Sequence, residues 1–251
     1  MHRFFIDKGS IVNNEVIING DEAKHIKEVL RMKKNDSLVL FDGQKSEYDA
    51  QIKDFINKSI VCKINKVYEN TSEPPINIVL FQSIPKSDKM DYIVQKCVEI
   101  GVNKIVPVVT ERTIVKLKNN KSVQEKKINR WKKISLEASK QSGRGTVPVI
   151  DYPIMMDDIK EYLSDFDFEI KLLPYEKEGN NKLKSLLKEV NEKINIAVFI
   201  GPEGGFKEEE VKMLIDCGFK IVSLGPRILR TETAGITVIS IIQYELGDVG
   251  T

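Results

Sequence analysis

Residues 195–242 read NIAVFIGPEGGFKEEEVKMLIDCGFKIVSLGPRILRTETAGITVISII. In this stretch a β-type apolar run, Ile196–Ile200, stops at Gly-Pro-Glu-Gly-Gly, and a shorter run, Ile221–Leu224, stops at Gly-Pro-Arg. A polar helical pattern follows the first stop from Lys207, and an apolar one follows the second as far as about Leu246. The stretch therefore predicts two strand–loop–helix units, which are typical of an α/β fold with a largely parallel sheet.

The composition of the two loops suggests a ligand site. Ligands of open α/β sheets bind beyond the carboxyl ends of the strands. Glycines let a ligand approach the backbone, and prolines restrict φ and stiffen the loop. Such a loop presents N–H and C=O groups that suit an adenine edge, although two tight turns without a ligand would carry the same residues. The glycines and prolines are Gly201, Pro202, Gly204, Gly205, Gly225 and Pro226.

The paired motifs GPEGGF and LGPRILRTETA, about twenty residues apart, resemble those of the SPOUT RNA methyltransferases. More narrowly, they resemble the bacterial family that methylates N3 of a uridine in small-subunit (16S) ribosomal RNA. The resemblance covers nearly the whole chain. It implies a carboxyl-terminal α/β domain, residues 74–247, whose elements form a deep trefoil knot.

The resemblance also implies a cofactor, S-adenosylmethionine, bound in the knot. The chain has neither the glycine-rich loop of a Rossmann methyltransferase after its first α/β strand nor a phosphate-binding P-loop, so the donor site is expected in the carboxyl-terminal loops. The expected cofactor-binding residues are Leu173, Phe199, Ile200, Gly201, Pro202, Glu203, Gly204, Gly205, Leu224, Gly225, Pro226, Ile228, Leu229, Arg230, Thr231 and Ala234.

Methyl transfer to a uridine ring nitrogen requires placement of the two reactants and removal of the imide proton. Arg227 and Arg230 flank the second loop and are candidates to stabilise charge on the uracil oxygens. Alternatively, both arginines hold the loop or the cofactor carboxylate. Glu203 and Glu232 are candidates to accept the proton or hold the base, or else they are carboxylates favoured by a helix N-terminus.

The first 70 residues show short β-like runs separated by turn residues, and one helical pattern, Glu22–Met32. The segment His25–Lys33 and the early Arg3 resemble the amino-terminal signature of the same family. They imply a PUA-like β-barrel that binds RNA, residues 1–70. The polar, proline-ended stretch Glu69–Pro75 is the expected domain boundary.

After this boundary, strands alternate with helical patterns. The expected strands are Ile76–Gln82, Lys104–Val109, Val147–Ile150 and Phe168–Leu173, and the expected helices are Lys89–Ile100, Ser122–Ser142, Met155–Leu163 and Lys182–Asn191.

The net charge of the 251 residues is only +2, but the charge is unevenly distributed. From Arg112 to Thr146, eleven Lys and Arg face two Glu, whereas from Asp151 to Glu192 eleven acidic residues face six Lys. This asymmetry favours a basic face for polyanions, unless it is a solvated lysine-rich helix. The expected RNA-binding residues are Arg3, His25, Arg31, Lys86, Arg112 and Arg144.

The remaining expectations concern metal, compartment and assembly. Three separated cysteines and two histidines do not have the spacing of a metal site or a disulfide framework. We expect no metal and no membrane partner, and a cytoplasmic location, because no signal peptide or long apolar run is present. The apolar pattern Ile236–Tyr244 covers most of a helix circumference, which predicts a homodimer.

Two other functions remain open. The first is a related knotted methyltransferase acting on ribose 2′-hydroxyls or on transfer RNA. The second is an RNA-binding ribosome assembly factor without catalytic activity, which the intact GPEGG and LRTETA motifs disfavour.

Overall fold

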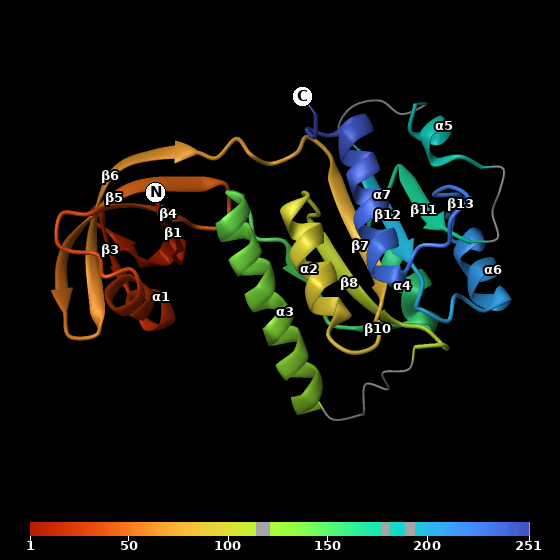
Figure 1. Cartoon of the computed structure of the whole chain (residues 1–251), viewed down its shortest axis with the longest axis horizontal. Helices are drawn as coiled ribbons and strands as arrows, with labels where there is room; N and C mark the ends of the chain where they lie inside the picture. The colour runs from red at the N-terminus through yellow and green to blue at the C-terminus, as the bar shows by residue number, and fades with distance from the viewer. Residues whose placement is uncertain (114–120, 177–180, 189–193, 251) are drawn as a thin grey trace. The chain divides into compact units, whose positions relative to one another are not determined.

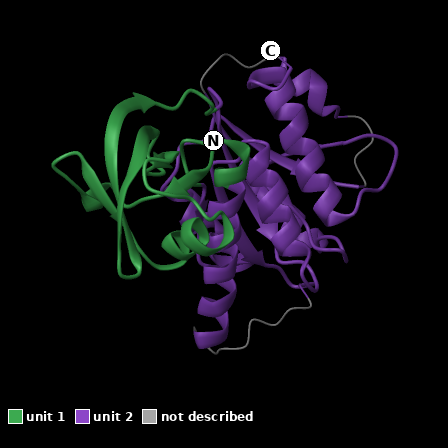
Figure 2. Cartoon of the chain, turned by 60° about the vertical axis from the view of Figure 1, so that its left-hand side comes forward, with its two compact units in different colours: residues 1–73, 139–147 green, residues 74–138, 148–251 purple. Residues whose placement is uncertain are grey.

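The computed structural model describes residues 1–113, 121–176, 181–188 and 194–250. It divides into two compact units (Figure 2). Unit 1 contains residues 1–73 and 139–147, and unit 2 contains residues 74–138 and 148–251. The return of residues 139–147 to unit 1 has no counterpart in the sequence pattern, which marks only the linker near Pro74.

Unit 1 is built on a six-stranded sheet with the order β1-β4-β5-β6-β3-β2. Strand β1 pairs parallel with β4, and the other neighbours pair antiparallel. The strands are β1 (Arg3–Phe5), β2 (Ile11–Val12), β3 (Glu15–Ile18), β4 (Ser37–Phe41), β5 (Ser46–Ile56) and β6 (Ser59–Glu69). The helical elements are η1 (Lys8–Ser10), α1 (Gly20–Lys24) and η2 (His25–Val29).

The helix of unit 1 ends earlier than the apolar pattern predicts. It begins as α1 and continues as one π-helical segment, η2, whose last residue is Val29 rather than Met32. Arg31 has a φ of 54°, in the left-handed region, so the helix cannot continue through it. The predicted helix Glu22–Met32 is therefore wrong at its carboxyl end, and Arg31 lies in the turn that follows.

Residues 139–147 are held in unit 1 by a dense set of polar contacts. The Arg3 guanidinium donates to the carbonyl oxygens of Ser139, Lys140 and Arg144 and pairs with Glu47. The Asn70 amide donates to the carbonyl oxygen of Gly143 at 3.0 Å. These contacts satisfy backbone groups that would otherwise be buried without partners.

Unit 2 is built on a seven-stranded parallel sheet with the order β10-β8-β7-β12-β11-β13, and β9 also pairs with β8. The strands are β7 (Asn77–Ser83), β8 (Lys104–Val109), β9 (Val149–Ile150), β10 (Ile154–Met155), β11 (Ile170–Pro174), β12 (Asn195–Ile200) and β13 (Lys220–Val222). The helices are α2 (Lys89–Glu99), α3 (Lys121–Ser142), η3 (Met156–Asp158), α4 (Ile159–Ser164), α5 (Leu183–Leu187), α6 (Glu208–Asp216) and α7 (Thr231–Leu246). The last four residues of α3, 139–142, belong to unit 1.

Helices cover both faces of this sheet, so its central strands are apolar on both sides. In β7, Ile78 and Leu80 join the core beneath α2, α3, α5 and α7, which lie on the near face in Figure 1. Val79 and Phe81 join the core beneath α4 and α6. The near-continuous apolar runs of the sequence thus become fully buried parallel strands, as predicted.

The predicted elements of unit 2 differ from the structure mainly at their ends. Strand β13 stops at Val222 instead of Leu224, so Ser223 and Leu224 belong to the loop. The predicted helix Met155–Leu163 begins as a short strand and a 3-10 turn before α4. Helix α5 ends at Leu187, and residues 189–191, which the prediction also included, lie outside the described residues.

Helix α7 buries more of its apolar surface within the chain than the sequence suggests. Val238, Ile239 and Ile242 are fully buried, because the helix packs on α2 and on strands β7 and β12. Tyr244 remains 67% exposed. In the part of the chain that the structure describes, neither α7 nor any other helix is long and apolar enough to cross a membrane.

The buried ion pair between Glu73 and Arg144 is expected to stabilise unit 1, and this contribution can be tested. Both side chains are almost fully buried, and the Glu73 carboxylate accepts from Arg144 Nη2 at 2.7 Å and from the Thr146 N–H at 3.0 Å. Burial raises the pKa of Glu73, but the hydrogen bonds and charge of Arg144 and the Thr146 N–H lower it more, so the net direction is downward. The stabilising contribution of Glu73 is therefore complete above its ordinary pKa and is lost as the pH falls through the lowered value.

We expect Arg144→Met to destabilise unit 1 by about 3–5 kcal/mol, because it leaves a buried carboxylate without its partner. Hydrogen exchange of the β5–β6 hairpin is the measurement, and Arg144→Met combined with Glu73→Leu should recover most of the protection. The matched control is Lys24→Met, because the Nζ of Lys24 lies 4.0 Å from Oε2 of Glu28 in an exposed ion pair, which contributes little to stability. Unchanged exchange in Arg144→Met would contradict the assigned role.

Candidate active site in the loops after three parallel strands

A cavity of 560 Å³ lies in unit 2 at the carboxyl ends of three adjacent strands. Strand β11 lies between β12 and β13 and is parallel to both, so the loops that follow the three strands leave the same edge of the sheet. The lining residues are Lys89, Pro174, Tyr175, Glu176, Ile200, Gly201, Pro202, Glu203, Gly204, Gly205, Phe206, Ser223, Leu224, Gly225, Pro226, Arg227, Ile228, Leu229, Arg230, Thr231 and Ala234.

Most of the cofactor residues expected from the sequence line this cavity, but two do not. The side chains of Leu173 and Phe199 are fully buried, and Phe199 packs against Phe81, Phe206 and Phe219. Both residues point from their strands into the core rather than into the loops, so their side chains cannot contact a ligand in the cavity. The last residue of β11 and the loop that follows, Pro174–Glu176, supply lining residues that the sequence did not predict.

A hydroxyl group connects the two Gly-Pro loops. Thr231, the first residue of α7, donates from Oγ1 to the carbonyl oxygen of Gly201 at 2.6 Å. The same hydroxyl accepts from the amide Nε2 of Gln82 at 3.0 Å, and Gln82 is fully buried in β7. Thr231 therefore attaches the start of α7 both to the loop after β12 and to the neighbouring strand.

The loop after β12 needs glycine for reasons that the structure makes explicit. A Cβ atom on Gly201 would lie 2.8 Å from the Phe206 ring, and Gly205 has a φ of 68°. Gly225, in the second loop, has a φ of 114° and no heavy atom within 4 Å of its Cβ position. Gly225 thus leaves open space in the cavity that a side chain would fill.

Arg112 is exposed, and it also braces the first loop. Its Nη1 donates to the carbonyl oxygen of Gly204 at 2.8 Å, and its aliphatic carbons pack over Gly204. Next to it, the buried carboxylate of Glu210 accepts from the backbone N–H groups of Glu111 and Lys207, each at 2.9 Å. The segment after β8 and the start of α6 therefore hold the Gly-rich loop from outside the cavity.

Both acidic candidates contact the same lysine. The Nζ of Lys89 lies 3.1 Å from Oε1 of Glu203 and 3.2 Å from Oε2 of Glu232. Burial raises the pKa of Glu203, but hydrogen bonds from the backbone of Glu203, from Lys89 and from the backbone of Lys86 bring the net direction below its ordinary value. The contact with Glu203 raises the pKa of Lys89, burial opposes this, and Glu232 raises it again. Both shifts favour the charged forms of Glu203 and Lys89.

The two arginines of the second loop are chemically available. Arg227 and Arg230 are exposed, line the cavity, and make no side-chain hydrogen bond or ion pair with any described residue. Between them, Ile228 is 84% exposed. Guanidinium groups stay charged and can donate two parallel hydrogen bonds, so this loop offers a cationic fork to an anionic or oxygen-rich ligand. Among the described residues, no cluster of His, Cys, Asp or Glu is arranged to hold a metal ion.

The residues expected to contact RNA fall into two groups. His25 and Arg31 in unit 1, and Lys86 and Arg112 in unit 2, are exposed. Arg144 is only 3% exposed, and the Arg3 side chain is 14% exposed and engaged with Glu47. These two guanidinium groups hold residues 139–147 in place and do not present charge to a polyanion, which corrects the expectation for Arg3 and Arg144.

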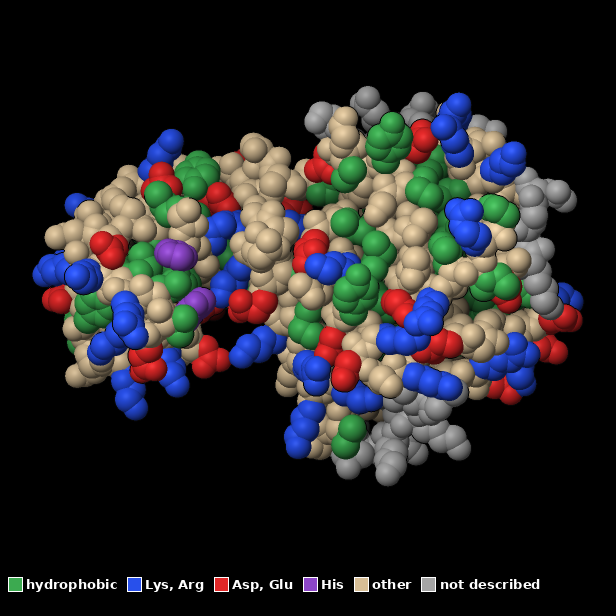
Figure 3. All heavy atoms as spheres, viewed as in Figure 1, with side chains coloured by type: hydrophobic (Ala, Val, Ile, Leu, Met, Phe, Trp, Pro, Cys, Tyr) green, Lys and Arg blue, Asp and Glu red, His purple; other side chains and the backbone are tan. Residues whose placement is uncertain are grey.

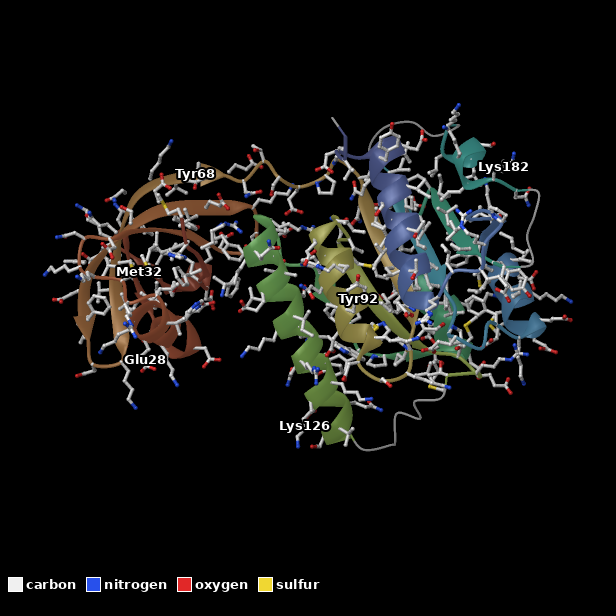
Figure 4. The ribbon with its side chains drawn as sticks, viewed as in Figure 1. Glu28, Met32, Tyr68, Tyr92, Lys126 and Lys182 are labelled. Carbon is white, nitrogen blue, oxygen red and sulfur yellow. The ribbon has the colours of Figure 1, made fainter. Side chains whose placement is uncertain are left out.

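The basic region of the sequence corresponds in part to the outer side of α3. Lys126, labelled in Figure 4, and Arg130 and Lys132 are exposed. Figure 3 shows Lys and Arg side chains over the amino-terminal half of this helix, with carboxylates among them. Arg130 pairs with Asp91, so part of the charge is neutralised locally. Lys116 and Lys118, which contribute to the charge count, lie outside the described residues.

Comparisons with known proteins agree with this geometry. Residues 72–243 match the model of an RNA methyltransferase domain, and residues 18–65 match an RNA methyltransferase PUA domain. The chain is 31% identical to ribosomal RNA small subunit methyltransferase E of Bacillus subtilis, covering 98% of this chain and 97% of the relative. It is 34% identical to the protein of the same name from Aquifex aeolicus, covering 96% of this chain and 99% of the relative.

A solved structure gives the same result. The crystal structure of ribosomal RNA small subunit methyltransferase E from Neisseria gonorrhoeae bound to S-adenosyl methionine matches with a TM-score of 0.87 and 34% identity, covering 99% of each chain. The chain described here therefore belongs to the RNA methyltransferases, with a PUA domain in unit 1, and within them to the ribosomal RNA small subunit methyltransferase E family.

Proposed function

We propose that the protein transfers a methyl group from S-adenosylmethionine to N3 of a uridine in 16S ribosomal RNA. The observation that carries the proposal is the glycine-lined cavity at the ends of β11, β12 and β13, which has two free arginines at its rim. The names of the relatives support a ribosomal RNA substrate, and the bound ligand of the Neisseria protein supports the cofactor.

The residues present fit the cofactor. The cavity combines the glycine-rich backbone of the two loops with the open space over Gly225 and the apolar side chains of Ile200, Leu224 and Leu229. An adenosyl group needs such a mixture of apolar contact and a few placed hydrogen-bonding groups. When bound, S-adenosylmethionine supplies an electrophilic methyl group.

The protein's task is then to prepare the uracil. Neutral N3 carries a proton, and its lone pair is delocalised, so N3 reacts only as the imidate. The negative charge of the imidate spreads onto the two flanking oxygens. Arg227 and Arg230 lie on the loop next to the donor site and can stabilise that charge where it develops. Neither arginine has a competing partner among the described residues, which supports a role toward substrate over a role in holding the loop.

We further propose the finer fold features implied by the family. The sheet of unit 1 forms a PUA-like β-barrel, and the carboxyl-terminal part of unit 2 forms a deep trefoil knot. Support for the knot comes from the positions of consecutive elements. Strand β13 lies at one end of the sheet, next to β11. Helix α7, which follows β13 in the chain, packs instead on α2, β7 and β12. The segment from Ser223 to Arg230 must therefore cross back over the ends of two strands to reach α7.

RNA binding is proposed for exposed basic residues within each unit. In unit 1 these are His25 and Arg31, and in unit 2 they are Lys86, Arg112 and the outer side of α3. Phosphate neutralisation by such side chains supplies affinity without sequence specificity, which base contacts near the cavity would provide.

The cofactor site is tested by a pair of glycine variants. Gly225→Ala places a methyl group in the cavity and adds strain of about 1–3 kcal/mol at positive φ. We expect at least a tenfold rise in the Kd of S-adenosylmethionine, measured by calorimetry. Gly143→Ala is the matched control, because Gly143 has a φ of 79°, open space around its Cβ position, and no place in the cavity. Equal affinities in the two variants would locate the cofactor elsewhere.

The arginine roles are tested by separating turnover from cofactor affinity. Arg230→Ala and Arg227→Ala are expected to retain the Kd for S-adenosylmethionine, while at least one of them lowers kcat by about 10²-fold or more. Lys212→Ala, which removes an exposed charge of α6, serves as the control. Nucleoside mass spectrometry should identify 3-methyluridine in the product. A 2′-O-methyl or ring-carbon methyl product, or normal turnover in both variants, would refute the assignment.

A homodimer is proposed because unit 2 exposes large apolar side chains, Ile228 in the cavity lining and Tyr244 on α7. Ile228 and Tyr244 are 84% and 67% exposed, and burial of such side chains on association is favourable by roughly 1.5–3 kcal/mol each. Light scattering at micromolar concentration should give twice the chain mass, and Tyr244→Glu should shift the protein toward monomer. Ile56→Glu, at an exposed position of unit 1, should have no effect. A monomeric wild-type protein would overturn the proposal.

A further inference from the structure

Lys89 occupies a position that helix stability does not explain. It is the first residue of α2, where a cation is disfavoured by the positive end of the helix dipole. Its ammonium group turns instead toward two carboxylates, Glu203 and Glu232, which belong to segments far away in the sequence. The placement therefore favours a role in the cavity that Lys89 lines.

The contacts of Lys89 bring three segments together. Glu203 belongs to the loop after β12, and its Oε1 also accepts from the backbone N–H of Lys86 at 3.1 Å. Glu232 lies in the first turn of α7. These segments can meet because β7 and β12 are parallel neighbours in which Gln82 is paired with Ile200, so their loops start at the same level. One ammonium group thus connects the loop after β12 with the starts of α2 and α7.

Lys89 provides the positive charge that faces the carboxylates of Glu203 and Glu232. Oε2 of Glu232 is buried and makes no hydrogen bond, so its charge is compensated mainly by the ammonium 3.2 Å away. Arg130, another cation near the start of α2, is already paired with Asp88 and Asp91. Without Lys89, two neighbouring carboxylates would face each other in a partly buried site, which is unfavourable.

We propose that Lys89 is a positioning residue that assembles the cofactor cavity by holding Glu203 and Glu232, and that these carboxylates shape the cavity instead of accepting the imide proton. The inference rests on the proposed function, since it takes this cavity as the cofactor site. A carboxylate that is ionised and paired with an ammonium is a weak base, so the imide proton leaves to water. Glu203 and Glu232 then act on the reaction only through the loops they hold.

The central experiment combines charge removal with charge compensation. Lys89→Met is expected to raise the Kd of S-adenosylmethionine at least tenfold, whereas Lys89→Arg stays within about threefold of wild type. Adding Glu232→Gln to Lys89→Met removes the uncompensated charge and should recover most of the lost affinity. A side chain that merely fills space would not be rescued in this way. Lys96→Met is the control, because Lys96 lies on the same helix and pairs with Glu99 outside the cavity.

The single variant Glu232→Gln separates positioning from proton transfer. As the loss of a positioning contact should, it is expected to raise the Kd of S-adenosylmethionine by less than Lys89→Met does, and to leave the shape of the pH dependence of kcat as in wild type. Loss of turnover with unchanged cofactor affinity would make Glu232 a base and overturn the proposal. An unchanged Kd in Lys89→Met, or a double variant no better than the single one, would overturn it as well.

Hydrogen exchange of the cavity loop tests the role of Lys89 separately from the proposed function, because it does not require S-adenosylmethionine to bind. In Lys89→Met the amides of Gly204 and Gly205 should exchange faster than in wild type, whether or not S-adenosylmethionine proves to be the ligand. If wild type fails to bind S-adenosylmethionine, the proposed function fails, and the exchange result alone decides the role of Lys89. Should Lys89→Met not fold, Glu203→Gln combined with Glu232→Gln must loosen the same loop, and unchanged exchange there would reject the proposal.

Discussion

The parallel pairing of β7, β12, β11 and β13 is the constraint on which the candidate site depends. Parallel neighbours end at one edge of a sheet, so the loops that follow them must share the space beyond that edge. The register sets the finer placement, because Gln82 of β7 is paired with Ile200 of β12. From these positions Gln82 can reach the Thr231 hydroxyl, and Thr231 can reach the Gly201 carbonyl oxygen.

The loop after β12 and the start of α7 are held by three sets of contacts. The Gln82–Thr231–Gly201 hydrogen bonds are neutral and buried, so they depend little on salt or pH. The Lys89 cluster is charged and partly exposed, and water and ions weaken it more readily. Arg112 and Glu210 add a third set of contacts on the outer side of the loop. These contacts hold the loop after β12 and the starts of α2 and α7 at the cavity, which suits a preformed ligand site.

Arginine has contrasting roles in the two units. A guanidinium has five donors, and in unit 1 Arg3 and Arg144 use theirs on carbonyl oxygens and carboxylates. In this way residues 139–147, which follow 65 residues of unit 2, become part of unit 1. Arg227 and Arg230 have no such partners among the described residues and remain available at the cavity. Charge counts along the chain do not distinguish these situations, because the difference lies in which acceptors the fold brings near.

The sequence by itself determined the elements and the chemistry of the loops. The apolar run of β12, the helical period of α2 and the Gly-Pro stops are local properties, and local properties persist in any fold that buries those runs. They located nearly all of the cavity lining after β12 and β13. Only the tertiary structure decided that β11 lies between these strands, that Leu173 and Phe199 face the core, and that Lys89 joins Glu203 to Glu232. Those outcomes depend on strand order and on contacts between residues more than a hundred positions apart, for which a single sequence carries no periodic signal.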